Sequence, residues 1–152
     1  MELGGDERTR GDIAKHGYTV MHVMEESGLP PFAYSIGIQQ QTGAPEVVVI
    51  GLKRPMAHSV VNEYNSRVRA GERFESGKFY SGFLEGFDVC VEEVPRSAYE
   101  RYFGQDLDFY GGPKFDVLQI IFPTTNGVWP WSEDAKPSFR QWQPILAKIG
   151  LT

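Results

Sequence analysis

The sequence contains a single cysteine among its 152 residues. One cysteine cannot form an internal disulfide, and it excludes a zinc site built from several cysteines. This residue, Cys90, lies in the segment FDVCVEEV, where strand alternation places it on the same face as Asp88 and Glu92. We interpret Cys90 as an ordinary strand residue, with a catalytic nucleophile as the alternative.

Histidine is also scarce, and recognisable catalytic motifs are missing. His16, His22 and His58 show no HExxH or HxH spacing, so we expect no metal site, although a site assembled by the fold is the alternative. No GxSxG nucleophile motif occurs. We interpret the acid pairs Glu92–Glu93 and Asp106–Asp108 as solvated surface and not as an acid–base pair. The sequence therefore predicts no catalytic residue.

Phosphate-binding loops are absent as well. No segment has the GxxxxGK[ST] spacing, and YGGP does not join a strand to a helix in the dinucleotide-binding manner. The segment QQQTGAP, residues 39–45, holds one glycine and neither lysine nor arginine. We therefore expect it to connect two strands without binding a ligand, and we expect no cofactor.

Charge and hydropathy exclude two further classes of partner. The formal net charge is −5 and the basic residues are scattered, whereas affinity for nucleic acids depends on clustered lysine and arginine. No apolar run is long enough to span a membrane, and the first residues do not form the apolar region of a signal peptide. We therefore expect no binding to nucleic acid, no membrane insertion and a cytoplasmic location.

The chain has the length and apolar content for one core. With 41% hydrophobic residues, no repeat and no shift of composition, residues 1–152 are predicted to form a single domain with residues 1–5 frayed. The clearest element is a long helix over about 55–70, with Pro55 in its first turn and Gly71 just past its end.

The remaining elements are shorter. Helices are expected over 6–16 with Asp6 as N-cap, from Pro95, and from 138 to the end, where Pro144 should kink or split the helix. Strands are expected in the segments YTVMHVME, 32–38, 46–52, 78–84, 87–94 and KFDVLQIIFP. The continuous apolar run VVVI predicts a central strand covered on both faces. The pattern indicates an α+β fold with a mixed or mainly antiparallel sheet.

Aromatic side chains are abundant near turns and prolines. Phe109 and Tyr110 lie in QDLDFYGGP, which we expect to be a loop, and Trp129 and Trp131 lie in NGVWPW. Exposed aromatic residues anchor many protein interfaces, so these four are candidate interface residues. The alternative is that the rings cover the sheet as small accessory cores, and we favour that interpretation for Trp142.

One ordered set of segments resembles the bacterial domain of unknown function family 4262: HGYTV, PPFAYSIGI, PEVVVIGL, VVNEYNSRVRAGERFESG, VLQIIFP and NGVWPW. The resemblance covers nearly the whole chain. Pro45–Glu46 and Gly51–Leu52 match the family pattern, while Ile38 stands where the family has leucine. Pro123 is followed by Thr124, where family members often carry aspartate. The resemblance to this family implies no activity.

A more distant similarity is to suppressor-of-fused-like domains. YSIGI, PEVVVIGL, the helix from Pro55, the segment Phe74 to Gly77 and VLQII follow one another in the same order. This resemblance implies a suppressor-of-fused-like fold and a role in binding other proteins, and bacterial members are thought to include immunity proteins that neutralise toxins.

Two hypotheses for function follow. The first is a non-catalytic cytoplasmic protein-binding module, of the immunity or antitoxin type, that neutralises a toxin by direct binding. The alternative is a small enzyme or a domain that binds flavin or another small ligand in a pocket near the 32–52 strand pair. That pocket would be lined by some of His16, His22, Tyr34, Glu46 and His58.

Overall fold

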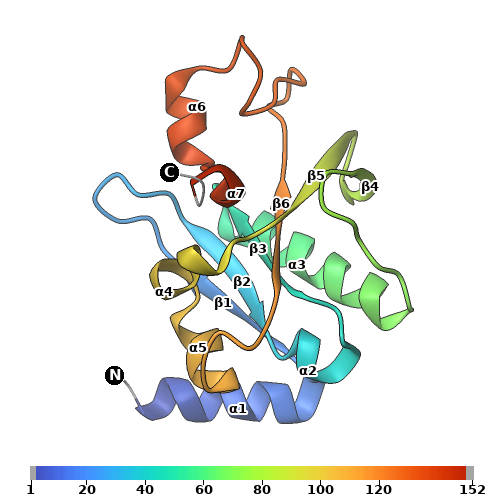
Figure 1. Ribbon diagram of the computed structural model, residues 1–152, viewed down its shortest axis with the longest axis vertical. Helices are drawn as coiled ribbons and strands as arrows, with labels where there is room; N and C mark the ends of the chain where they lie inside the picture. The colour runs from blue at the N-terminus through green and yellow to red at the C-terminus, as the bar shows by residue number, and fades with distance from the viewer. Residues whose placement is uncertain (1–2, 150–152) are drawn as a thin grey trace.

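The computed structural model describes residues 3–149 of the chain, and the side chains of residues 9–147. It is built on one six-stranded sheet with the order β1-β2-β3-β6-β5-β4 (Figure 1). The strands are β1 (Thr19–Val23), β2 (Phe32–Ile36), β3 (Glu46–Ile50), β4 (Phe79–Leu84), β5 (Phe87–Glu93) and β6 (Val117–Ile121). The helical segments are α1 (Leu3–His16), α2 (Ile38–Thr42), α3 (Arg54–Arg69), η1 (Arg96–Ala98), α4 (Tyr99–Tyr102), α5 (Gly104–Tyr110), α6 (Pro137–Trp142) and α7 (Leu146–Ile149).

The sheet is mixed, as the sequence predicts. Neighbours β3 and β6 run parallel, with Glu46 opposite Val117, while the other neighbouring pairs are antiparallel. Every residue of β3 and of β6 is buried, which confirms that the continuous apolar runs form the central strands. The fold is therefore α+β, with hairpins on both sides of one parallel pair.

Helices cover both faces of this sheet. Because successive strand side chains point to opposite faces, Val47 and Val49 pack on the side of α3, and Val48 and Ile50 pack on the side of α4. In Figure 1, α3 lies behind the sheet, and α4, α5 and α7 lie in front of it. The long helix predicted at about 55–70 is thus confirmed, and its apolar stripe faces the core: Ala57, Val60, Val61, Tyr64 and Val68.

Two segments expected to be loops contain helices. The connection after β2 includes α2, which follows Gly37 at φ 106 and ends at Gly43 at φ 81, both in the region that favours glycine. The segment QDLDFYGGP forms most of α5, and Gly111 follows the last residue of this helix. Both helices have at most seven residues, so neither shows a helical repeat in the sequence.

The N-terminal helix begins earlier than expected. Helix α1 starts at Leu3, so Asp6 lies within the helix and is not its N-cap. Residues 1 and 2 fall outside the described part of the chain. Helix α1 contacts β1, and Ile13 reaches the core on the α4 side of the sheet.

Pro144 separates α6 from α7, which confirms the predicted break. The side chain of Gln143 hydrogen-bonds both backbone groups of Phe122, just beyond β6, over 2.9 and 2.8 Å. Gln119 of β6 donates to the carbonyl of Pro144 and accepts from the N–H of Leu146. Two buried glutamines therefore attach the C-terminal segment to the central strand. None of the helices within residues 3–149 has both the length and the apolar content to cross a bilayer.

Candidate functional site

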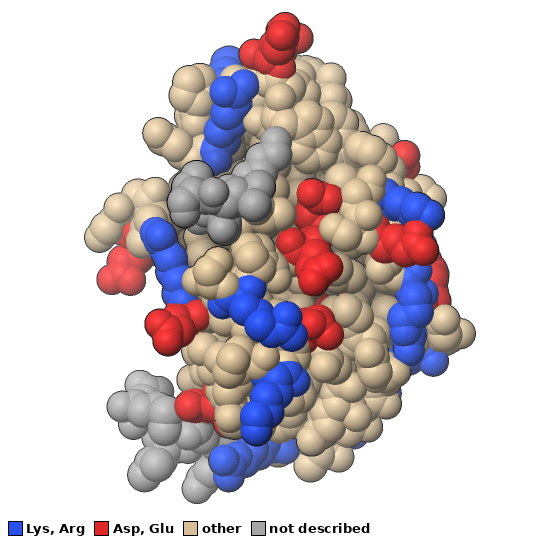
Figure 2. Space-filling model, viewed as in Figure 1, with Lys and Arg blue, Asp and Glu red and all other residues tan. Residues whose placement is uncertain are grey.

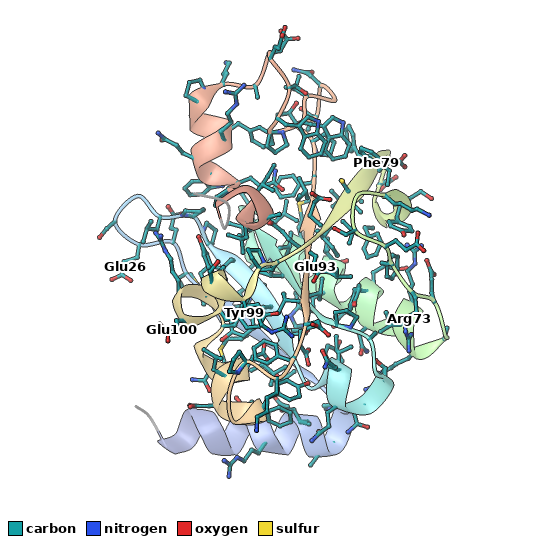
Figure 3. All side chains as sticks on the ribbon, in the orientation of Figure 1. Glu26, Arg73, Phe79, Glu93, Tyr99 and Glu100 are labelled. Atoms are coloured by element: carbon teal, nitrogen blue, oxygen red, sulfur yellow. The ribbon has the colours of Figure 1, made fainter. Side chains whose placement is uncertain are left out.

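Three aromatic rings meet at the sheet edge formed by β4, and we call Phe79, Trp129 and Trp131 the aromatic surface. The two indoles stack with ring centres 5.0 Å apart and planes 7° from parallel. The ring of Phe79 meets that of Trp129 edge-on at 5.2 Å. Phe79 is 52% exposed and Trp131 is 38% exposed, and Figure 3 labels Phe79 at this edge of the molecule. Two of the four predicted interface residues are therefore neighbours.

Backbone hydrogen bonds hold the segment that carries the indoles. A turn closes where Thr124 and Val128 pair, and the N–H of Trp129 donates to the hydroxyl of Ser132 over 3.1 Å. From α6, Arg140 donates to the carbonyls of Pro130 and Ser132 over 3.0 and 2.8 Å. The two rings are thus presented on a braced turn, although the segment contains no helix or strand.

Trp129 also has a structural role. Its inner side packs against a small cluster formed by Cys90, Ile121 and Ile145. Cys90 lies on the face of β5 that it shares with Asp88 and Glu92, and α7 and the tryptophan cover this face at Cys90. Burial raises the pKa of the Cys90 thiol to about 11. A protonated, covered thiol is a poor nucleophile, in agreement with its interpretation as a strand residue.

The backbone of β4 is poorly suited to pairing with another strand. The β4–β5 register shifts between Tyr80 and Leu84, and Gly82 has φ 92. Arg67 of α3 donates to the carbonyl of Ser81 over 2.7 Å, which occupies an acceptor on the free edge. Bulges and occupied edge groups disfavour strand addition. Binding at this edge would therefore use side chains.

The other two predicted interface residues lie elsewhere, on α5. The ring of Tyr110 stacks on Phe115 at 5.1 Å, and its hydroxyl donates a short hydrogen bond to Glu46. Phe109 meets Tyr110 edge-on and lines shallow depressions beside α1. Both residues are partly buried, and Tyr110 contributes to internal packing.

Glu46 is a fully buried carboxylate at the start of β3. It accepts from the hydroxyl of Ser35 over 2.7 Å and from the backbone N–H groups of Gly37, Ile38 and Gln39 over 3.0–3.2 Å. These N–H groups belong to the first turn of α2, where no preceding residue caps the helix with its side chain. Burial raises the pKa of Glu46, while the hydrogen bonds from Tyr110, Ser35 and the backbone oppose that rise. The carboxylate thus serves as an internal cap for α2.

Asp106 of α5 is buried as well, and the interpretation of Asp106–Asp108 as solvated surface is wrong for this residue. Neither carboxyl oxygen finds a hydrogen-bond donor within the described part of the chain. Burial, and then the negative charge of Glu46, raise the pKa of Asp106 well above its ordinary value. Burial without a donor therefore favours the protonated form of Asp106, whereas the donors around Glu46 favour its charged form.

The histidines divide between two places. His22 Nε2 and His58 Nδ1 lie 3.0 Å apart, joining β1 to α3. Burial, then the charges of Arg54 and His58, lower the pKa of His22 to about 4, so its ring is neutral at pH 7. His16 lies at the end of α1, while Tyr34 and Glu46 lie on the α5 side. Among the described side chains, no group of three or more His, Cys, Asp or Glu is arranged to hold a metal ion.

Sequence reasoning missed Phe79, and it named Glu46 only as a candidate lining residue of a ligand pocket. Phe79 begins a strand whose alternation, with Tyr80 facing inward against Phe74, leaves its own ring outward. Glu46 is the only charged residue in the otherwise apolar run EVVVI, which was a signal of a specific buried role. No sequence pattern marked Asp106.

The family model described as Domain of unknown function (DUF4262) matches residues 12–136 of the chain. That range contains all six strands, the helices from α2 to α5 and the whole aromatic surface. The searches among curated proteins and among solved structures each gave no significant match.

Proposed function

Because the chain belongs to the DUF4262 family, whose description assigns no activity, we propose a function from its surface: a non-catalytic module that binds another protein. The observation that carries this proposal is the aromatic surface, in which the exposed rings of Phe79, on the edge strand, and Trp131, on the braced turn, both contact Trp129. Tryptophan and other large aromatic side chains dominate the binding energy of protein interfaces. Rings that are already held in place lose little conformational freedom on binding.

The charge of the molecule indicates what the partner presents. Exposed acidic residues lie close to the aromatic surface: Glu133 and Asp134 follow Trp131 in the sequence, and Asp88 lies on β5, next to β4. The nearest exposed base along that turn is Lys136. On the face of the molecule that Figure 2 shows, acidic side chains are grouped near the centre, where Figure 3 labels Glu93. With a net charge of −5, the module suits a partner with a basic surface and an apolar protrusion.

The finer form of the proposal concerns the kind of partner. The order of segments shared with suppressor-of-fused-like domains supports a protein-binding role, and bacterial domains of that type are thought to include immunity proteins. An inhibitor of this kind needs complementary shape and charge and no reactive group. We therefore extend the proposal to a cytoplasmic immunity protein that neutralises a toxin by direct binding.

The first prediction tests the aromatic surface with the double variant Phe79→Ala/Trp131→Ala. Trp129 stays unchanged because it packs against Cys90, Ile121 and Ile145. A partner recovered with the native protein from host lysate, and then purified, should bind the double variant more weakly by about 2 kcal/mol or more, roughly thirtyfold. Isothermal titration calorimetry measures the affinity, and thermal unfolding verifies that the variant is folded.

The matched control is Leu29→Ala/Met56→Ala, which removes two exposed apolar side chains away from the aromatic surface. It should bind the partner as the native protein does. Equal affinity of the aromatic double variant would return these rings to a structural role.

For the immunity proposal, the partner should be toxic when expressed alone, and the native module, unlike the aromatic double variant, should restore growth. A harmless partner would remove the immunity proposal and leave the binding proposal standing.

A further inference from the structure

A separate pocket lies where β1, β2 and the end of β3 meet the first turn of α3. Its volume is about 340 Å³. This size is at the lower end of the range of small-molecule sites. The wall is mainly apolar, with Phe32, Leu52 and Trp142 among its residues, and its polar members include His22, Lys53 and Arg54. The aromatic surface contributes no residue to this lining.

The aromatic wall of the pocket is held in place. The indole N–H of Trp142 donates to the carbonyl of Gly51 over 3.0 Å, which ties α6 to the end of β3. Gly51 has φ 96, and a Cβ atom there would lie 2.8 Å from the carbonyl oxygen of Trp142. Only glycine permits this close approach, so the pocket is formed before any ligand arrives.

The polar side of the pocket carries more positive than negative charge. Within residues 9–147, neither Lys53 nor Arg54 forms an ion pair. Glu25 is the single acidic residue of the lining, against these two cations. Arg54 lies close enough to His22 to repel its protonated form. The positive end of the α3 dipole adds to the same field.

We propose that this pocket binds a small organic carboxylate, with its apolar body against Phe32, Leu52 and Trp142 and its charge beside Lys53 and Arg54. The apolar wall gains nothing from a bare inorganic anion, and the two cations favour a carboxylate over a neutral molecule of the same shape. The neutral imidazole of His22, which already contacts His58, offers a further polar contact at the same side.

The test uses phenylpropionate as the probe and its amide, phenylpropanamide, as the uncharged control of the same shape. Amide chemical shifts of the isotope-labelled native protein are followed as each compound is added. Phenylpropionate should shift the signals of residues 51–54 and of His22, and it should bind at least ~fivefold more tightly than the amide, since each exposed ion pair contributes modestly. Acetate, which lacks the apolar body, should bind more weakly still.

Two double variants test whether Lys53 and Arg54 cause the preference for the carboxylate over its amide. Lys53→Gln/Arg54→Gln should remove most of the preference for phenylpropionate over its amide, while Lys114→Gln/Lys136→Gln, which removes two exposed lysines elsewhere, should preserve it. The spectrum of each variant shows whether it is folded. Equal binding of acid and amide, shifts confined to other parts of the molecule, or no binding would each overturn the proposal.

This inference does not depend on the proposed protein partner. Phe79→Ala/Trp131→Ala should bind phenylpropionate as the native protein does, because the pocket and the aromatic surface share no residue. Failure of carboxylate binding therefore leaves the protein-binding proposal intact, and the reverse also holds.

Discussion

At the scale of single residues, Glu46 and Asp106 place two carboxyl groups inside the half of the molecule that α4 and α5 cover. Glu46 has hydrogen bonds from Ser35, Tyr110 and three backbone groups, so its negative charge is distributed among donors. Asp106 has no such donor within the described residues, and burial and then the charge of Glu46 raise its pKa and so favour its neutral form. The buried Asp106 therefore lowers the free energy of unfolding by an amount that depends on pH.

The second prediction concerns that cost. The pKa of Asp106 is raised in the folded state, so above its ordinary pKa the unfolded chain loses the proton first, and stability falls as pH rises toward the folded-state pKa. The slope approaches about 1.4 kcal/mol per pH unit for one group. Asp106→Asn carries no titrating proton, so its stability relative to the native protein should increase between pH 5 and pH 8 by about 1 kcal/mol or more.

Urea unfolding at the two pH values measures this difference. Asp108→Asn is the matched control, because it makes the same substitution at an exposed position of the same helix. A difference between Asp106→Asn and the native protein that stays constant with pH would contradict the assignment of a neutral Asp106.

At the scale of elements, one side chain of α3 adds polar and aromatic contacts to the packing of the edge strand β4 against this helix. Arg67 donates to the carbonyl of Ser81 and makes two hydrogen bonds to Glu72 over 2.9 and 2.7 Å. Its guanidinium also lies 5.1 Å from the ring centre of Phe74 and 4.6 Å from that of Phe83. These contacts connect the helix, the turn after it and the free edge of the sheet, which is the strand that carries Phe79.

The third prediction is that Arg67→Met lowers the free energy of unfolding by about 1–3 kcal/mol, because it removes a hydrogen bond to the edge and the cation–aromatic contacts together. Amide hydrogen exchange of β4 should accelerate more than that of β3. Glu72→Gln, which weakens only the partly exposed ion pair, should cost less than about 1 kcal/mol. Equal losses for the two variants would mean that the ion pair, and not the attachment of β4, is what stabilises this edge.

At the scale of the whole molecule, the core extends beyond the part that the family model covers. The match ends at residue 136, yet Leu146 is fully buried and Gln143 and Gln119 are fully buried with their hydrogen bonds made. The segment after residue 136 also supplies Trp142, which lines the pocket beside Lys53 and Arg54 and hydrogen-bonds Gly51. It is therefore an integral layer of this chain.

The fourth prediction is that a chain ending at Lys136 loses cooperative unfolding and binds a hydrophobic dye, because the truncation exposes apolar surface around β6 and leaves Gln119 without its partners. The full chain, which keeps the contacts of Gln119 with Pro144 and Leu146, is the reference. Circular dichroism and dye fluorescence during urea titration measure both. Cooperative unfolding of the short chain at the native midpoint would show that the C-terminal layer is dispensable.

The sequence by itself determined the α+β class, the central position of the apolar strands, the long helix, the break at Pro144 and the family. These features depend on local patterns: runs such as VVVI require cover on both faces, and a proline or glycine limits an element wherever it occurs. It also marked Trp129 and Trp131 as unusual. Tertiary structure alone decided what surrounds each side chain. Asp106 is buried, and Phe109 and Tyr110 lie in α5 and not in a loop. The ring of Phe79 contacts the indole of Trp129, and the ring of His22 contacts that of His58. Burial and the approach of distant segments determine these outcomes, and neither is encoded in the spacing of neighbouring residues.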